Sequence, residues 1–194
     1  SSISLTHTSV DTLTSALSKV VSILAPDGCH MVGHSLGGLL SVTIADKLSP
    51  FIRSVTLIAP AGLGQDINRD FLKKFVSVKK RREMKQVLAL LVENDNLITS
   101  SMVEKALMVG RIDGATEALT RISEDMLEKI ENGSVARLLK DLNCSLKLIW
   151  GERDLIIPVA VLDCEIVDGV GHMPHLESPA SVNEMIEKHL KENS

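Results

Sequence analysis

Aromatic side chains are nearly absent from this sequence of 194 residues, which has no tyrosine, one tryptophan and three phenylalanines. Aromatic residues usually supply much of the buried area of a core, so aliphatic residues must supply it here. Hydrophobic residues make up 44% of the sequence. That fraction is enough to fill the core of one domain that carries an insertion.

Signals of several protein classes are also missing. Three cysteines are too few and too irregular for a disulfide framework, which favours a reducing, cytoplasmic compartment. Cys29 and Cys164 fall in predicted strands, where we expect small buried hydrophobic residues. No apolar run predicts a membrane span or a signal peptide. With a net charge of −4, no metal-binding spacing and no glycine-rich nucleotide loop, we expect no nucleic acid, membrane or metal partner.

The segment Gly33–Gly38, with the sequence Gly-His-Ser-Leu-Gly-Gly, has the pattern of a nucleophile elbow. It follows a short apolar run at 29–32 and precedes an apolar, helix-like run at 39–48. In such a strand–turn–helix context, G-x-S-x-G holds a serine hydroxyl above the end of a sheet. The alternative is a glycine-rich turn that contains a serine by chance, because short matches recur.

Each residue of this elbow has an expected part. We expect Gly33 and Gly37 to remove collisions in the sharp turn and His34 to pack within it. Ser35 is the candidate nucleophile. The amide of Leu36 then lies at a helix N-terminus, where it can bind an oxyanion.

An aspartate and a histidine follow two later predicted strands. Asp154 comes just after a strand at 146–150, and His172 comes just after one at 164–167. Polar residues at the ends of parallel strands, in the order serine, aspartate, histidine, are typical of a hydrolytic triad. We therefore predict Ser35, Asp154 and His172 as nucleophile, orienting acid and general base.

Three blocks of the sequence resemble signatures of the α/β-hydrolase superfamily: Val32–Gly38, Ile149–Asp154 and Gly171–Glu177. The resemblance covers nearly the whole sequence and implies a mostly parallel sheet flanked by helices. It also implies earlier strands and a loop with a His-Gly motif that supplies the second oxyanion amide. The sequence contains neither, so we expect the N-terminal strands of the fold to be absent and further residues to precede Ser1.

Other segments resemble the hydrolase-fold dihydrolipoamide acetyltransferase component of acetoin dehydrogenase complexes: Ser54–Gly64, Arg81–Lys85 and Arg111–Gly114. This resemblance implies transfer of acetyl from a lipoyl arm to coenzyme A. Coenzyme A and lipoamide would be substrates, and no cofactor would be bound covalently. Other subunits of a dehydrogenase complex would be partners. A lipoyl domain precedes the hydrolase domain in that family, and none is visible here.

Several alternatives stay open. The acyl acceptor is undetermined, so the protein could instead hydrolyse a small ester or a C–C bond, or serve as a non-catalytic docking module. His175 is an alternative base, whereas Asp168 more naturally shapes a turn and Asp66 is a weaker alternative acid. The spacing His7-x-x-x-Asp11 resembles that of trimeric lipoamide acyltransferases, but it lacks the glycine that follows there, so we take it as chance.

The chain divides into a partial hydrolase core at 1–64 and 143–194 and a helical cap at 65–142. We expect the cap to cover the site, although a plain helical excursion is the alternative. Capping boxes are predicted at Thr8-x-x-Asp11 and Ser101-x-x-Glu104. An amphipathic helix is predicted from Val10 to Leu24, with an apolar stripe of Val10, Leu13, Leu17, Val20 and Leu24. Further helices are predicted in the cap at 70–76, 82–92, 101–109, 115–130 and 135–142, and at 179–190, where the last helix packs on the sheet.

Two further features of the sequence carry expectations. The stretch Val159–Asp163 is too short for a crossover helix between parallel strands, so we expect residues to be missing after Pro158 or the crossover to have shrunk.

A basic run is either a solvated helix face or a contact for the phosphates of coenzyme A or for an acidic partner. It comprises Lys73, Lys74, Lys79, Lys80, Arg81, Arg82 and Lys85.

Overall fold

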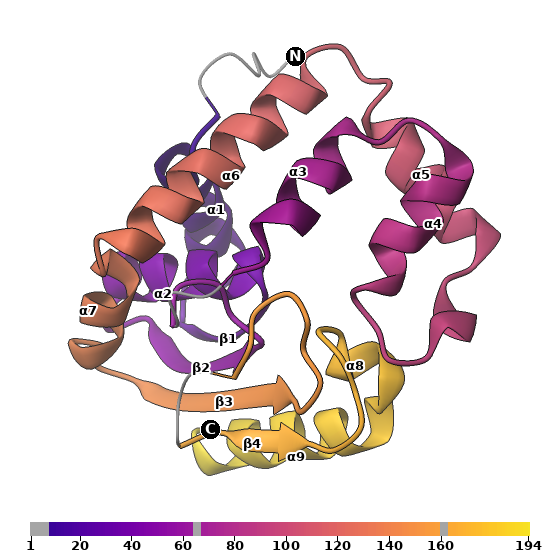
Figure 1. Ribbon diagram of the computed structural model, residues 1–194. Coiled ribbons are helices and arrows are strands. Elements are labelled where there is room, and N and C mark those ends of the chain that lie inside the picture. The colour runs from indigo at the N-terminus through magenta and orange to yellow at the C-terminus, as the bar shows by residue number, and fades with distance from the viewer. Residues whose placement is uncertain (1–7, 64–66, 160–162) are drawn as a thin grey trace.

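A parallel β-sheet forms the base of the molecule (Figure 1). The computed structural model describes residues 8–63, 67–159 and 163–194. Within them the sheet has the order β1-β2-β3-β4 and every neighbouring pair is parallel, as predicted. No strand precedes β1 in residues 8–28. The strands are β1 (Cys29–His34), β2 (Ile52–Ile58), β3 (Ser145–Gly151) and β4 (Glu165–Val167).

Helices cover both faces of this sheet. Alternate residues of a strand point to opposite faces, and β2 shows the consequence. Val55 and Leu57 pack in the cluster that contains residues of α2 (Leu36–Leu48), whereas Ile58 packs in the cluster of α9 (Pro179–Glu192). The predicted packing of the last helix on the sheet is therefore confirmed. Burial on both faces explains why β2 is an almost continuous apolar run.

The first helix, α1 (Val10–Leu24), differs from the sequence expectation in two ways. Its capping box is formed by Ser9 and Thr12 rather than by Thr8 and Asp11. Its buried side chains are Val10, Thr14 and Ser18, and the Thr14 hydroxyl lies 2.9 Å from that of Thr43 on α2. Three members of the predicted apolar stripe consequently face outward, namely Leu17, Val20 and Leu24.

In the part of the chain that the structure describes, five helices lie between β2 and β3, and they share one core with the sheet. The largest apolar cluster contains Leu39 of α2, Trp150 of β3, Met84 of α4 and Met126 of α6. The last of the five helices, α7, packs against α2. The division of the chain into a core and a cap stays a prediction. The five helices are α3 (Arg69–Ser77), α4 (Arg81–Ala89), α5 (Ser100–Val109), α6 (Ala115–Glu131) and α7 (Ser134–Lys140), with a short 3₁₀ turn at Asp95–Leu97.

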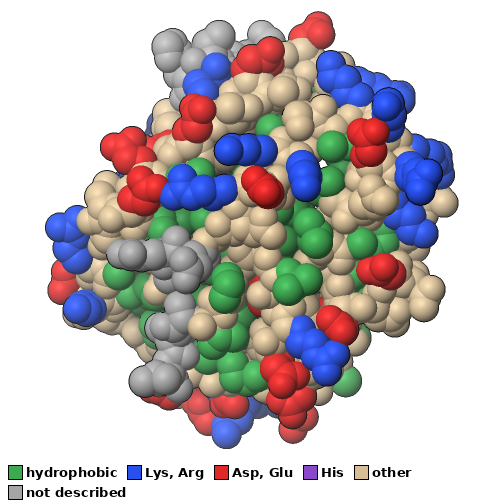
Figure 2. All heavy atoms as spheres, in the orientation of Figure 1, with side chains coloured by type: hydrophobic (Ala, Val, Ile, Leu, Met, Phe, Trp, Pro, Cys, Tyr) green, Lys and Arg blue, Asp and Glu red, His purple; other side chains and the backbone are tan. Residues whose placement is uncertain are grey.

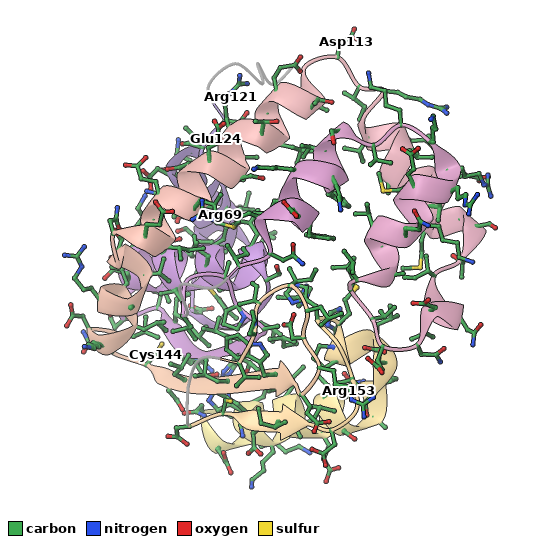
Figure 3. All side chains as sticks on the ribbon, viewed as in Figure 1. Arg69, Asp113, Arg121, Glu124, Cys144 and Arg153 are labelled. Atoms are coloured by element: carbon green, nitrogen blue, oxygen red, sulfur yellow. The ribbon has the colours of Figure 1, made fainter. Side chains whose placement is uncertain are left out.

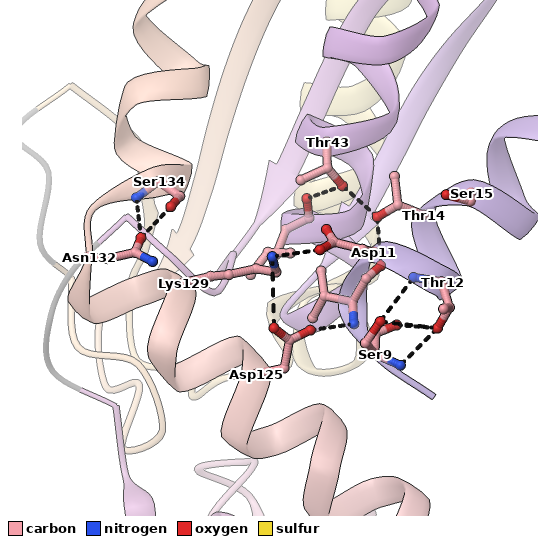
Figure 4. Close-up of polar contacts among 12 residues, drawn as sticks. Ser9, Asp11, Thr12, Thr14, Ser15, Thr43, Asp125, Lys129, Asn132 and Ser134 are labelled. Atoms are coloured by element: carbon pink, nitrogen blue, oxygen red, sulfur yellow. Dashed lines mark hydrogen bonds and ion pairs between the residues drawn. The ribbon is translucent and has the colours of Figure 1, made fainter. Parts of the chain in front are cut away.

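Polar contacts tie α6 to the start of α1 (Figure 4). The Asp125 carboxylate accepts a hydrogen bond from the Val10 amide at 2.7 Å, and the Lys129 ammonium lies 3.1 Å from the Asp11 carboxylate. Lys129 also lies 3.7 Å from Asp125. These contacts fix α6 above the sheet, where it forms one wall of the cavity described below.

Other local expectations are corrected by the structure. The N-cap of α5 is Thr99, whose hydroxyl accepts from the Met102 amide at 3.2 Å, so the predicted Ser101 box is wrong. Cys29 and Cys164 are only half-buried, and Cys164 precedes β4. Residues 160–162, on which the question of a crossover helix depends, lie outside the described residues. None of the helices in the described ranges is long and apolar enough to span a bilayer.

Candidate active site

Ser35 lies in a strained turn between β1 and α2. Its backbone angles are φ 53° and ψ −121°, in a region that residues other than glycine rarely adopt. The backbone around it holds this conformation. The Ser35 amide donates to the Ile58 carbonyl at 3.0 Å, and the Ser35 carbonyl accepts from the Ala61 amide at 3.0 Å. Strain that is retained by such surrounding contacts is typical of functional positions.

Two glycines give this turn the space that it needs. A Cβ atom on Gly33 would lie 2.4 Å from the Gly37 carbonyl oxygen, and one on Gly38 would lie 2.6 Å from Pro60 Cβ. The expectation for Gly37 is wrong, because a Cβ there would meet no described atom within 4 Å beyond its chain neighbours and the adjacent backbone of its own helix. The second crowded position of the elbow is therefore Gly38.

The structure brings the three predicted residues together at the ends of the strands. The Nε2 atom of His172 lies 3.0 Å from Ser35 Oγ, and its Nδ1 atom lies 2.7 Å from Asp154 Oδ2. His172 and Asp154 are both buried. Because a carboxylate only accepts, Nδ1 carries the proton and Nε2 faces the serine hydroxyl as an acceptor.

The carboxylate of Asp154 is fixed by its own loop. Its Oδ1 atom accepts hydrogen bonds from the amides of Ile156 and Ile157 at 2.8 and 2.9 Å. Trp150, which is fully buried in β3, donates from its indole nitrogen to the Ile157 carbonyl at 2.8 Å. Oδ2 therefore points at His172 from a preorganised loop.

The loops that carry the acid and the histidine pack backbone to backbone. A Cβ on Gly151 would lie 2.0 Å from the Gly171 carbonyl oxygen, so only glycine fits there. The Arg153 amide also donates to the Val170 carbonyl at 2.9 Å. The pattern of the sequence placed Gly151 in a family-like block but gave no steric reason for it.

Glu177 is a positioning residue that the sequence reasoning missed. Its Oε2 accepts from the Gly171 amide at 2.6 Å. Its Oε1 accepts from the amides of Glu93 and Asn94 at 2.8 and 3.0 Å. Glu177 thus joins the histidine loop to the segment that follows α4. Its presence in the block Gly171–Glu177 was the available signal.

Two more histidine rings lie beside His172. The His34 ring centroid is 4.7 Å from that of His172 and 4.6 Å from that of His175. The His34 Nε2 atom donates to the His172 carbonyl at 2.8 Å, which is the polar contact of the elbow histidine. His175 contacts His34 and makes no hydrogen bond to Ser35 in the described structure, whereas His172 does. Geometry thus favours His172 over the alternative base.

Protonation of His34 is disfavoured in the folded protein. Burial, followed by the neighbouring His172 ring, lowers the pKa of His34 to about 4, although the hydrogen bond to the His172 carbonyl and the nearby Asp154 partly offset the effect. Burial and His172 also lower the pKa of His175. Both rings are therefore neutral near pH 7.

This depressed pKa predicts acid lability. The unfolded chain has a histidine pKa of about 6.5 and binds more protons than the folded chain between that value and about 4. Stability is consequently lost as the pH falls through this window. The variant His34→Gln keeps an N–H donor for the His172 carbonyl but does not titrate, so its urea midpoint should fall less on acidification. Equal loss in both proteins would contradict the prediction.

The other candidates from the sequence are the oxyanion amide of Leu36 and the alternative acids Asp168 and Asp66. The Leu36 amide is the first N–H of α2 and has no acceptor within the helix, as an oxyanion donor requires. Asp168 is exposed in the turn after β4 and contacts neither Ser35 nor His172 in the described structure. Asp66 and His7 lie outside the described residues. No group of potential ligands in the described part of the chain could hold a metal ion.

Sequence comparisons identify the family of the chain. A model of the alpha/beta hydrolase family matches residues 2–185. The dihydrolipoyllysine-residue acetyltransferase component of the acetoin cleaving system from Cupriavidus necator is 30% identical over 172 residues, which cover 84% of this chain and 46% of that protein. Monoacylglycerol lipase abhd6-B from Xenopus laevis is 24% identical over 171 residues, which cover 77% of this chain and 51% of that protein. The chain thus spans about half the length of the curated relatives it matches.

A structural comparison agrees on the fold. The meta-cleavage product hydrolase from Pseudomonas fluorescens IP01 superposes with a TM-score of 0.84 at 16% identity. The match covers 100% of this chain and 76% of that one. At this identity the likeness concerns the fold alone. The family match over almost the whole sequence and the shared fold lead to one conclusion: the chain belongs to the alpha/beta hydrolase family.

Proposed function

We propose that this chain is the catalytic part of an acyl-transfer enzyme in which Ser35 is the nucleophile. The observation that supports this most directly is the pair of contacts at His172, 3.0 Å to Ser35 and 2.7 Å to Asp154. His172 would accept the Ser35 proton while Oγ attacks an acyl carbonyl carbon. Asp154 would hold the imidazole in the required tautomer and stabilise its charged form.

The rest of the reaction uses the same groups. The Leu36 amide would stabilise the negative oxygen of the tetrahedral intermediate. The leaving group takes the proton from His172, and an acyl-enzyme remains on Ser35. His172 then removes a proton from the acceptor, which attacks the acyl-enzyme and releases the product. With a thiol acceptor the outcome is acyl transfer, and with water it is hydrolysis.

Transfer of acetyl from a dihydrolipoyl arm to coenzyme A is the specific reaction that we favour. It is supported by the relative from the acetoin cleaving system at 30% identity, and other subunits of such a complex would then be partners. The alternative is hydrolysis of a small ester or a C–C bond, and the lipase relative at 24% identity favours an ester. A docking module without catalysis is the second alternative.

Time courses with 4-nitrophenyl acetate, with and without coenzyme A, test these proposals. For an acetyltransferase we expect a stoichiometric burst of nitrophenolate, a slow steady state, and a steady state that coenzyme A accelerates while acetyl-coenzyme A forms. Turnover that coenzyme A leaves unchanged would favour the hydrolase. Absence of both the burst and labelling by a fluorophosphonate probe would contradict catalysis and favour the docking module.

The basic run offers a place for the phosphates of coenzyme A. Arg81 pairs with Glu104, and Lys80 lies 3.4 Å from Glu83. Arg82 and Lys85 line an open groove of about 410 Å³ between α4 and α5, without an ion pair in the described structure.

Reversing the charges of this groove should weaken the acceptor step alone. For the double variant Arg82→Glu and Lys85→Glu we expect KM for coenzyme A to rise by about tenfold or more, because ion pairs with phosphate are lost. Initial acylation by 4-nitrophenyl acetate should stay within about twofold. The control, Lys188→Glu and Lys191→Glu on α9, changes net charge equally. If KM did not change, the basic run would be a solvated helix face.

A further inference from the structure

A cavity of about 270 Å³ adjoins the candidate nucleophile. Ser35 and His172 form part of its wall, and α3 and α6 supply much of the rest. Figure 3 shows these two helices above the sheet, and they pack against each other. Hydrophobic side chains are also visible in the middle of this face of the molecule, below a row of charged side chains (Figure 2). The cavity thus joins the reacting hydroxyl to an apolar interior.

The wall of this cavity is apolar and uncharged. Phe71 and Phe75 come from α3, and Ile122 and Met126 come from α6. No aspartate, glutamate, lysine or arginine lines it in the described structure. Apart from His34, Ser35 and His172, Ser123 of α6 is the one polar side chain among the described residues of the lining. A charged or strongly polar group would lose its hydration there without gaining hydrogen bonds in return. The cavity therefore favours binding of hydrocarbon groups.

The size of the cavity sets a length for that hydrocarbon. At roughly 30 Å³ for each water-sized unit, a volume of about 270 Å³ holds roughly nine such units. A two-carbon acyl group would leave most of the space unfilled. We propose that the cavity binds an uncharged hydrocarbon chain of roughly six to eight carbons joined to the scissile carbonyl, either as the acyl chain or as the arm of the leaving group. This inference rests on the proposed function of Ser35.

Two substrate series test the inference and locate the chain. In one series the acyl chain of 4-nitrophenyl esters is lengthened, and in the other the alkyl arm of S-alkyl thioacetates is lengthened. Burying one methylene contributes about 0.8 kcal/mol, so kcat/KM should rise about threefold to fourfold per carbon until the cavity is full. A rise in the first series places the chain on the acyl side, and a rise in the second places it on the leaving group. A flat profile in both series would overturn the inference.

A variant that fills the cavity sharpens the test. Ser123→Phe places a ring in the wall, so the gain with chain length should disappear, measured within this variant as the ratio of kcat/KM for the longer esters to kcat/KM for 4-nitrophenyl acetate. The matched control is Glu124→Phe, which adds the same ring at the neighbouring exposed position of α6 (Figure 3). If both variants kept the full gain with chain length, the cavity would not be the binding site.

Binding without catalysis separates this inference from the proposed function. Octanamide and acetamide can be titrated calorimetrically into Ser35→Ala. Preferential binding of octanamide that Ser123→Phe removes would uphold the cavity even if Ser35 proved unreactive. Equal, weak binding of both amides would overturn the cavity assignment even if the fluorophosphonate probe labelled Ser35.

Discussion

Replacing Ser35 with alanine is expected to abolish the burst of nitrophenolate and to lower kcat for 4-nitrophenyl acetate by about 10⁴-fold or more. The hydroxyl lies 3.0 Å from His172 Nε2, and the other ring nitrogen of His172 contacts Asp154. Removing the hydroxyl therefore leaves His172 without the group that it would deprotonate. Stopped-flow absorbance measures the burst, and mass spectrometry detects the acyl-enzyme on the peptide that contains Ser35.

A second serine provides the control for this experiment. Ser123→Ala removes a hydroxyl from the same cavity but not from the reacting atoms, so the burst should remain. The thermal midpoint of each variant shows whether it is folded. An undiminished burst in folded Ser35→Ala would exclude Ser35 as the nucleophile and, with it, the proposed reaction.

Two glycines of the same elbow should respond in opposite directions to alanine. At Gly33 the new Cβ would lie 2.4 Å from the Gly37 carbonyl oxygen and from Ser41 Oγ. The carbonyl cannot move aside without distorting the start of α2, so we expect Gly33→Ala to lower the free energy of unfolding by about 3 kcal/mol. At Gly37 the Cβ meets open space, and alanine in a helix should be neutral or stabilising by up to about 1 kcal/mol.

Urea denaturation followed by far-ultraviolet circular dichroism measures both effects. The two variants control for each other, because they make the same chemical change within one motif. If Gly33→Ala were as stable as the unaltered protein, the close packing of β1 on α2 would be incorrect. If Gly37→Ala were strongly destabilised, the open space beside that residue would be incorrect.

The sequence was informative wherever a feature was local or periodic. Apolar runs placed β1, β3 and β4 within a few residues, and the ends of those strands predicted that Asp154 and His172 would meet Ser35. Contacts between distant segments were beyond such reasoning. Glu177 acts through the amides of Glu93 and Asn94, and nothing in a single sequence connects these positions.

The errors have physical reasons of the same kind. Thr8 and Ser9 are adjacent hydroxyl residues, so a shift of one residue in the start of α1 decides which of them is the N-cap. The face that α1 buries depends on Thr43 of α2, not on the apolar stripe. The elbow motif predicted crowding at Gly37, but the second crowded position is Gly38. The crowding there comes from Pro60, which follows β2 and is not part of the motif.

The lone tryptophan gives the protein an internal optical probe. Trp150 is fully buried, its indole nitrogen is bound to the backbone beside Asp154, and no tyrosine emission overlaps with its signal. Intrinsic fluorescence therefore reports on one place, the segment that aims the carboxylate at His172. A shift of the emission maximum to the red would register the opening of that segment to water, separately from the loss of helix elsewhere.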